Sequence, residues 1–160
     1  MPYTERETGS FAGSLAMGFV LAIAGAIVYA LIFIIMKAVM GGRLAPWMSL
    51  VLAVFGCVVI GSLVGGGIRG GGGTRGGILN RIVAVLLAYA GIAVGMTAVA
   101  HDPSTVFRQS IAKTIEAPIA NADVKTIAIM ALGLLFAFFF AAGAEPKSKG
   151  AAIKVSKAGE

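Results

Sequence analysis

The sequence predicts an all-α membrane protein with four transmembrane helices and a short amphipathic interfacial helix between the third and the fourth. The 160-residue chain is 58% hydrophobic and only 12% charged, and a water-soluble core of this length cannot hide so much apolar surface. Four apolar stretches contain no charged residue. Each has roughly the 17–25 residues that an α-helix needs to cross a bilayer.

The four stretches are predicted to be helices because backbone groups inside a bilayer can be satisfied only within the protein. The first stretch follows a polar segment of mixed charge, residues 1–13, and is longer than a signal-peptide core, so we expect a retained helix. Trp47 opens the second stretch as an interfacial anchor. The predicted spans of this transmembrane domain (14–144) are residues 14–36, 47–64, 82–100 and about 126–144.

Residues 103–116 are predicted to form the short amphipathic helix, lying on the outer membrane surface. Asp102 supplies a capping carboxylate and Pro103 suits the first helical position. Pro118 is expected to end the helix. Apolar residues recur along it at four-residue spacing: Phe107, Ile111 and Ile115.

The basic residues predict the topology. With the N-terminus inside, eight Lys and Arg side chains fall in inside segments and five in outside segments, so both termini are expected to be cytoplasmic. Residues 145–160 are rich in lysine and small residues, and are expected to form a basic disordered tail.

Small residues recur at every fourth position of the spans, which places them on one face of each helix. Because lipid tails are as apolar as leucine, helices in a bilayer associate largely through close backbone approach across small side chains. This pattern fits intramolecular packing of a four-helix bundle, or the use of one ladder, such as the first, as a seam for a partner or a second copy. The ladders are Ser14, Gly18, Ala22, Ala26 and Ala30; Ser49, Ala53, Cys57, Gly61 and Gly65; Gly91 and Gly95, beside Ala84 and Ala88; and Gly133, Ala137 and Ala141.

The glycine-rich connection at residues 65–77 is expected to be a flexible cytoplasmic linker. Arg69, Arg75 and Arg81 are its candidate contacts to phospholipid headgroups. A Walker-type phosphate loop is excluded because the connection has no lysine and follows no strand. Two spaced arginines without interleaved aromatic residues form a poor platform for RNA, so no nucleic-acid partner is expected.

Residues suited to catalysis, proton transfer or metal binding are sparse in the spans. They hold no ionisable acid or base and no histidine, which argues against a proton pump and against haem ligation by imidazole. No nucleophile–base pair, carboxylate dyad or metal cluster can be assembled, so we expect no enzyme activity, cofactor or metal. His101 and Asp102 could form a metal or proton pair, but capping explains the aspartate. Cys57 is read as a small packing residue.

The run from Gly56 to Tyr89 contains Gly61-Ser62-Leu63-Val64-Gly65, Ile68-Arg69-Gly70, Arg75-Gly76-Gly77 and an Ala/Leu-rich continuation from Arg81. It resembles small multi-span bacterial membrane proteins of unassigned function. The resemblance spans about the first 100 residues and implies location in the bacterial inner membrane; it transfers no catalytic residue. Some members carry a zinc-ribbon module, for which this chain has no cysteine pair.

Two functional hypotheses follow. The first is a non-enzymatic protein of the lipid bilayer that acts through helix–helix contacts, as an accessory or anchoring subunit of a membrane complex or as a homo-oligomer. The second is a small channel or transporter with a pathway between protomers. The residues expected to carry the contacts are Gly18, Ala22, Ala26, Gly61, Gly65, Gly91 and Gly95.

Overall fold

The computed structural model describes residues 11–72, 77–100, 111–120 and 122–142. In this part of the chain the regular structure is entirely helical, and four of the helices are long and apolar enough to span a membrane. The prediction of four transmembrane helices, with a short helix between the third and the fourth, is confirmed. The helices are α1 (Phe11–Val39), α2 (Pro46–Gly72), α3 (Ile78–Ala100), α5 (Ile111–Ala120) and α6 (Val124–Ala142).

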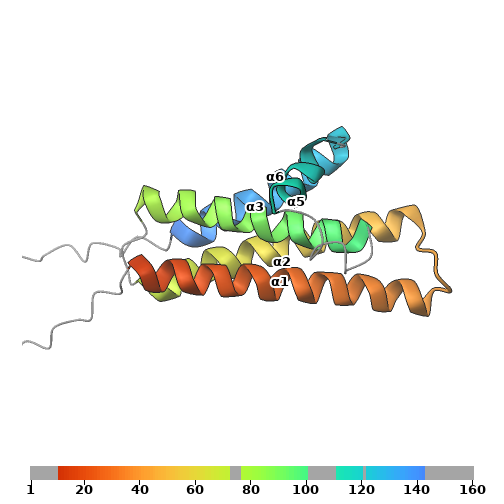
Figure 1. Ribbon diagram of the computed structural model, residues 1–160, viewed down its shortest axis with the longest axis horizontal. Helices are drawn as coiled ribbons and strands as arrows, with labels where there is room; N and C mark the ends of the chain where they lie inside the picture. The colour runs from red at the N-terminus through yellow and green to blue at the C-terminus, as the bar shows by residue number, and fades with distance from the viewer. Residues whose placement is uncertain (1–10, 73–76, 101–110, 121, 143–160) are drawn as a thin grey trace, which may run out of the picture.

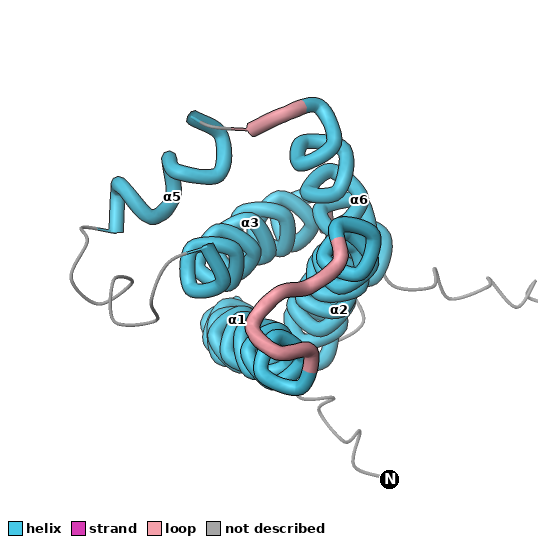
Figure 2. The backbone as a smooth tube through the Cα atoms, turned by 90° about the vertical axis from the view of Figure 1, so that its right-hand side faces the viewer, coloured by secondary structure: helices cyan, strands magenta, loops and turns pink. Residues whose placement is uncertain are grey.

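The long helices run antiparallel in chain order, so the start of α1 and the end of α6 lie at the same end of the bundle, on the left of Figure 1. Helix α2 is central: it packs against α1 on one side and against α6 on the other. Helix α3 contacts all three of these helices. Seen nearly along the bundle, α5 stands outside α3, away from α1 and α2 (Figure 2).

Small residues occupy the inside of the bundle and large ones its outside. Ala84, Ala88 and Ala137 are completely buried, whereas bulky side chains such as Phe19 and Phe139 are more than half exposed. This distribution is what a bilayer favours, since exposed apolar side chains meet lipid and small inner residues let the helices approach closely.

The closest approach is between α2 and α6. A methyl group at Gly61 would collide with the carbonyl oxygen of Gly133, and one at Gly133 would lie 2.6 Å from the carbonyl oxygen of Cys57. One turn further on, a methyl group at Gly65 would lie 2.5 Å from the carbonyl oxygen of Ala137. In each case the obstacle is backbone, which cannot move aside as a side chain can. Glycine at these positions is therefore required by the packing.

Tyr29 of α1 links three helices. Its ring lies against Gly56 of α2, where a methyl group would overlap the ring. On the α3 side, a methyl group at Gly95 would be 2.9 Å from Tyr29 Cδ1. The two glycines thus leave a slot that the aromatic ring fills.

Helix α2 continues to Gly72, so the predicted linker beginning at residue 65 is wrong for Gly65–Gly72. Ile68 explains the extension: it is completely buried and lies against Gly18, whose added methyl group would come within 2.6 Å of Ile68 Cγ1. Gly71 packs against the backbone of Gly13. Burial against α1 and α6 outweighs the low helix propensity of glycine in this segment.

Residues next to the helix ends fix where α1 ends and where α6 begins. After α1, Gly41 and Gly42 take positive φ angles of 72° and 90°, and the Gly42 N–H donates to the Lys37 carbonyl at 2.8 Å. Before α6, the Asp123 carboxylate accepts hydrogen bonds from the Thr126 N–H at 2.8 Å and from the Thr126 hydroxyl at 2.6 Å. Asp123 is thus the capping residue of α6.

The end of helix α5 differs from the predicted one. Pro118 was expected to end the helix, but it is buried inside α5, which continues to Ala120. A proline one turn from a helix end removes one backbone hydrogen bond, and the ring's burial offsets that loss. The predicted cap at Asp102 and Pro103, the residue Phe107, the segment 1–10 and the tail 145–160 lie outside the described residues.

Replacing Gly61 by leucine is expected to destabilise the bundle, because a side chain there would force the backbones of α2 and α6 apart. The loss in unfolding free energy should lie at or above the upper end of the ~1–3 kcal/mol typical of overpacking. Denaturant titration in detergent micelles measures it. Ala131→Leu, at an exposed small residue of α6, is the matched control and should leave unfolding nearly unchanged, since alanine and leucine have similar helix propensity.

The Asp123 cap predicts a pH dependence. Hydrogen bonds from the Thr126 side chain and backbone lower the pKa of the Asp123 carboxyl below its ordinary value. The stabilisation is therefore present above the unfolded pKa of about 3.9 and is lost as the pH falls through the lower folded value. At neutral pH the wild type should be more stable to thermal unfolding than Asp123→Asn, and this difference should disappear as the pH falls through the folded pKa of Asp123. A wild-type excess that persists at low pH would contradict the assignment.

Candidate functional site

The seven residues predicted to carry helix contacts, Gly18, Ala22, Ala26, Gly61, Gly65, Gly91 and Gly95, are all buried. Those of α1 face α2 and α3: Gly18 lies against Ile68, and a methyl group at Gly91 would be 3.1 Å from the Ala22 carbonyl oxygen. The first ladder is thus covered by the chain's own helices. In this structure it offers no free seam to a partner.

Two other glycines of α2 remain uncovered. Gly66 and Gly70 are exposed and lie one turn apart on one face, and no atom of the described residues lies within 4 Å of a carbon added at either position. The sequence reasoning missed them because it placed both in a linker. Their four-residue spacing, in a phase different from that of Gly61 and Gly65, was the signal that could have found them.

Two of the three candidate headgroup residues, Arg69 and Arg81, lie at the end of the bundle where α2 stops and α3 begins. Arg69 is exposed in the last turn of α2. The Arg81 guanidinium lies over the Phe138 ring, 5.3 Å from its centroid. Its Nε is buried without a hydrogen-bond partner among the described residues. Arg75 lies outside the described residues.

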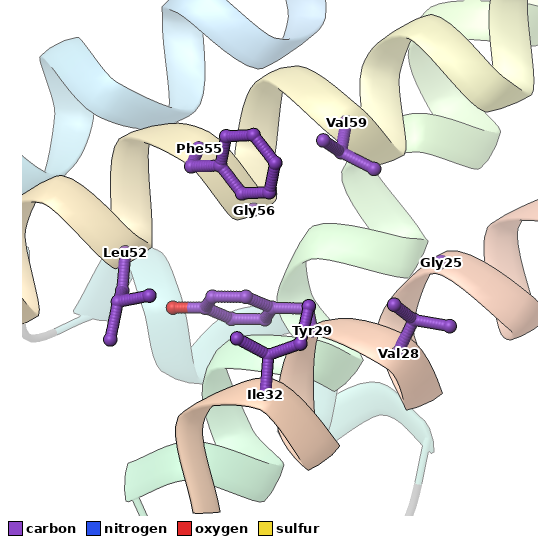
Figure 3. Close-up of a pocket in the computed structure, with 8 residues that line it drawn as sticks. All are labelled: Gly25, Val28, Tyr29, Ile32, Leu52, Phe55, Gly56 and Val59. Atoms are coloured by element: carbon purple, nitrogen blue, oxygen red, sulfur yellow. The ribbon is translucent and has the colours of Figure 1, made fainter. Parts of the chain in front are cut away.

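A small pocket of about 250 Å³ lies between α1 and α2. Figure 3 shows Tyr29 across it, with its hydroxyl pointing toward Leu52. Apart from that hydroxyl, the side chains around the pocket are apolar. The lining residues are Gly25, Val28, Tyr29 and Ile32 from α1, and Leu52, Phe55, Gly56 and Val59 from α2.

Helix α5 is attached to α3 at a specific point. The Tyr89 hydroxyl donates a hydrogen bond to the Ile115 carbonyl oxygen at 2.6 Å. Tyr89 lies midway along α3, and Thr114 and Pro118 of α5 are buried. The short helix is therefore seated beside the middle of α3. Its predicted place on the outer membrane surface stays a prediction.

Other chemistry-bearing groups are few in the part of the chain that the structure describes. No cluster of three or more His, Cys, Asp or Glu side chains is found there. Cys57 is free and buried, and its carbonyl oxygen faces Gly133, as expected of a small residue at a helix contact. His101 and Asp102 lie outside the described residues.

The helices and their apolar lengths together define an all-α membrane protein that crosses the bilayer four times. The chain matches no protein-family model, no curated protein and no solved structure.

Replacing Tyr89 by phenylalanine is expected to loosen α5 while keeping the ring in place. Loss of one hydrogen bond, worth about 1 kcal/mol net, should raise the opening equilibrium of α5 roughly five-fold. Amide hydrogen exchange of Ile111–Ala120 measures this change. Tyr29→Phe is the matched control and should leave exchange in α5 unaltered; equal exchange in Tyr89→Phe and wild type would show that the hydrogen bond does not hold the helix.

Proposed function

We propose that this chain is a non-enzymatic integral membrane protein that acts through helix–helix contacts. It serves as an accessory or anchoring subunit of a membrane complex, or as a homo-oligomer. The contact face on this proposal is formed by Gly66 and Gly70 of α2. This moves the seam from the first ladder, whose residues are buried within the bundle, to an exposed face.

The observation that carries the proposal is the open space around Gly66 and Gly70. A glycine inside a helix costs about 0.5–1 kcal/mol relative to alanine. For Gly61, Gly65 and Gly71 a neighbouring backbone explains why alanine is not used. No neighbour within the described chain explains the glycines at 66 and 70.

A second helix supplies such an explanation. Glycines at four-residue spacing let two membrane helices approach until their backbones touch, as Gly61 and Gly133 already do inside this bundle. Around the open face, Leu63 is 38% exposed and could flank the incoming helix. The partner is therefore a transmembrane helix, either of another membrane protein or of a second copy.

The proposed setting is the bacterial inner membrane with both termini in the cytoplasm. The resemblance of Gly56–Tyr89 to small bacterial membrane proteins supports the location, and the excess of basic residues in the inside segments supports the orientation. On this topology Arg69 and Arg81 lie at the cytoplasmic headgroup level. Their positive charge would favour anionic lipids there.

The double variant Gly66→Leu/Gly70→Leu tests the proposal, because two large side chains would prevent close helix approach. Affinity purification in mild detergent, followed by mass measurement of the complex, should show loss of the partner or of the oligomer. Ala131→Leu, at an exposed small residue of α6, is the matched control and should retain it.

The milder variant Gly66→Ala/Gly70→Ala separates association from folding. Each alanine should stabilise the isolated protein by about 0.5–1 kcal/mol, while the added methyl groups weaken the complex. A wild-type protein that purifies alone as a strict monomer would overturn the proposal. So would a complex that is unaffected by the leucine double variant.

A further inference from the structure

The pocket between α1 and α2 faces the side of the bundle where large side chains are exposed. Val28 and Phe55, which both line it, are 47% and 57% exposed. In a bilayer such an opening meets lipid and not water. A volume of about 250 Å³ is below the ~300–1,000 Å³ of pockets for drug-sized ligands, and an α-helix about 10 Å across is too thick to enter it. The dimensions suit a single hydrocarbon chain.

The Tyr29 hydroxyl gives the pocket its chemical character. Tyr29 is only 7% exposed, and Gly56 and Gly95 hold its ring on both sides. No hydrogen bond from this hydroxyl is found within the described chain, whereas the other described tyrosine in a span, Tyr89, donates to a carbonyl oxygen. A hydroxyl without a partner in an apolar medium is costly. An occupant that carries an oxygen acceptor would remove that cost.

Two basic residues lie at the end of the bundle toward which the Tyr29 hydroxyl points. Lys37 is eight residues after Tyr29, about 12 Å further along α1, and Arg43 follows in the turn to α2. Both side chains are exposed, and the segment from Lys37 to Pro46 contains no acidic residue. The hydroxyl points toward Leu52 (Figure 3), which is the side of the pocket nearer this turn. Along the bundle, from this turn toward the middle of the helices, the basic side chains come first, then the Tyr29 hydroxyl, and then the apolar part of the pocket.

We propose that this pocket binds one acyl chain of an anionic diacyl phospholipid. The chain fills the slot between α1 and α2, its ester carbonyl accepts a hydrogen bond from the Tyr29 hydroxyl, and the phosphate is held by Lys37 and Arg43. The order of groups in such a lipid, phosphate then ester then chain, matches the order of groups in the protein. The pocket residues of α2 lie in its first half, from Leu52 to Val59, whereas Gly66 and Gly70 lie near its end, so the site does not depend on the proposed contact face.

Ester-linked and ether-linked phosphatidylglycerol of equal chain length test the central contact, since the ether lipid lacks the carbonyl. Native mass spectrometry of the full chain in mild detergent gives the affinity for each lipid. We expect the wild type to bind the ester lipid about five-fold more tightly, the equivalent of one net hydrogen bond. Tyr29→Phe should bind both lipids equally, and Tyr89→Phe should keep the wild-type preference.

Two further variants test the slot and the charge. Leu52→Trp should fill the slot and lower the affinity for both lipids, and Lys37→Gln/Arg43→Gln should reduce the preference for phosphatidylglycerol over phosphatidylcholine. Equal affinity of the wild type for ester and ether lipids would overturn the proposal even if Tyr29→Phe did not fold. An ester preference that survives in Tyr29→Phe, or binding unaffected by Leu52→Trp, would also overturn it.

Discussion

The backbones of α2 and α6 touch where Gly61 meets Gly133, and the arrangement of the bundle depends on that contact. In a bilayer, two apolar helices gain little by leaving lipid for each other, so association relies on close packing of backbone and small side chains. Gly61, Gly65 and Gly133 permit that packing between α2 and α6. Because α6 occupies one side of α2, α1 packs against the other side. Helix α3 then contacts α1, α2 and α6.

Helix α2 therefore has three differently used faces. One face lies against α6 and a second against α1, and the glycines on both are explained by atoms that a methyl group would meet. The third face, at Gly66 and Gly70, has the same small residues but no neighbour among the residues that the structure describes. Because glycine weakens a helix unless packing offsets the loss, the unpaired face is the part of the molecule whose composition points to another helix.

Hydroxyl groups inside the spans follow a similar logic. Ser62 and Thr97 donate to the carbonyl oxygens four residues earlier, at 2.7 and 2.8 Å, and Tyr89 donates to Ile115 of α5. Each hydroxyl is thereby satisfied where water is absent. Tyr29 and Ser14 depart from this pattern, and of these two only Tyr29 lines the pocket. The lipid-binding proposal rests on the Tyr29 hydroxyl, which has no partner within the described chain, and on the apolar pocket beside it.

The sequence by itself determined the four spans, because the thickness of the hydrocarbon layer sets the length of an apolar helix. It also indicated which face of each helix carries small residues, since four-residue spacing is a property of one helix alone. Only the tertiary structure decided which helix covers each face: Gly61 meets α6, Gly18 meets α2, and Gly66 meets nothing described. It also decided that α2 continues past Val64, because Ile68 is buried by its neighbours, and that α5 is held beside α3. These features depend on contacts between segments far apart in the chain, which local patterns and propensities do not contain.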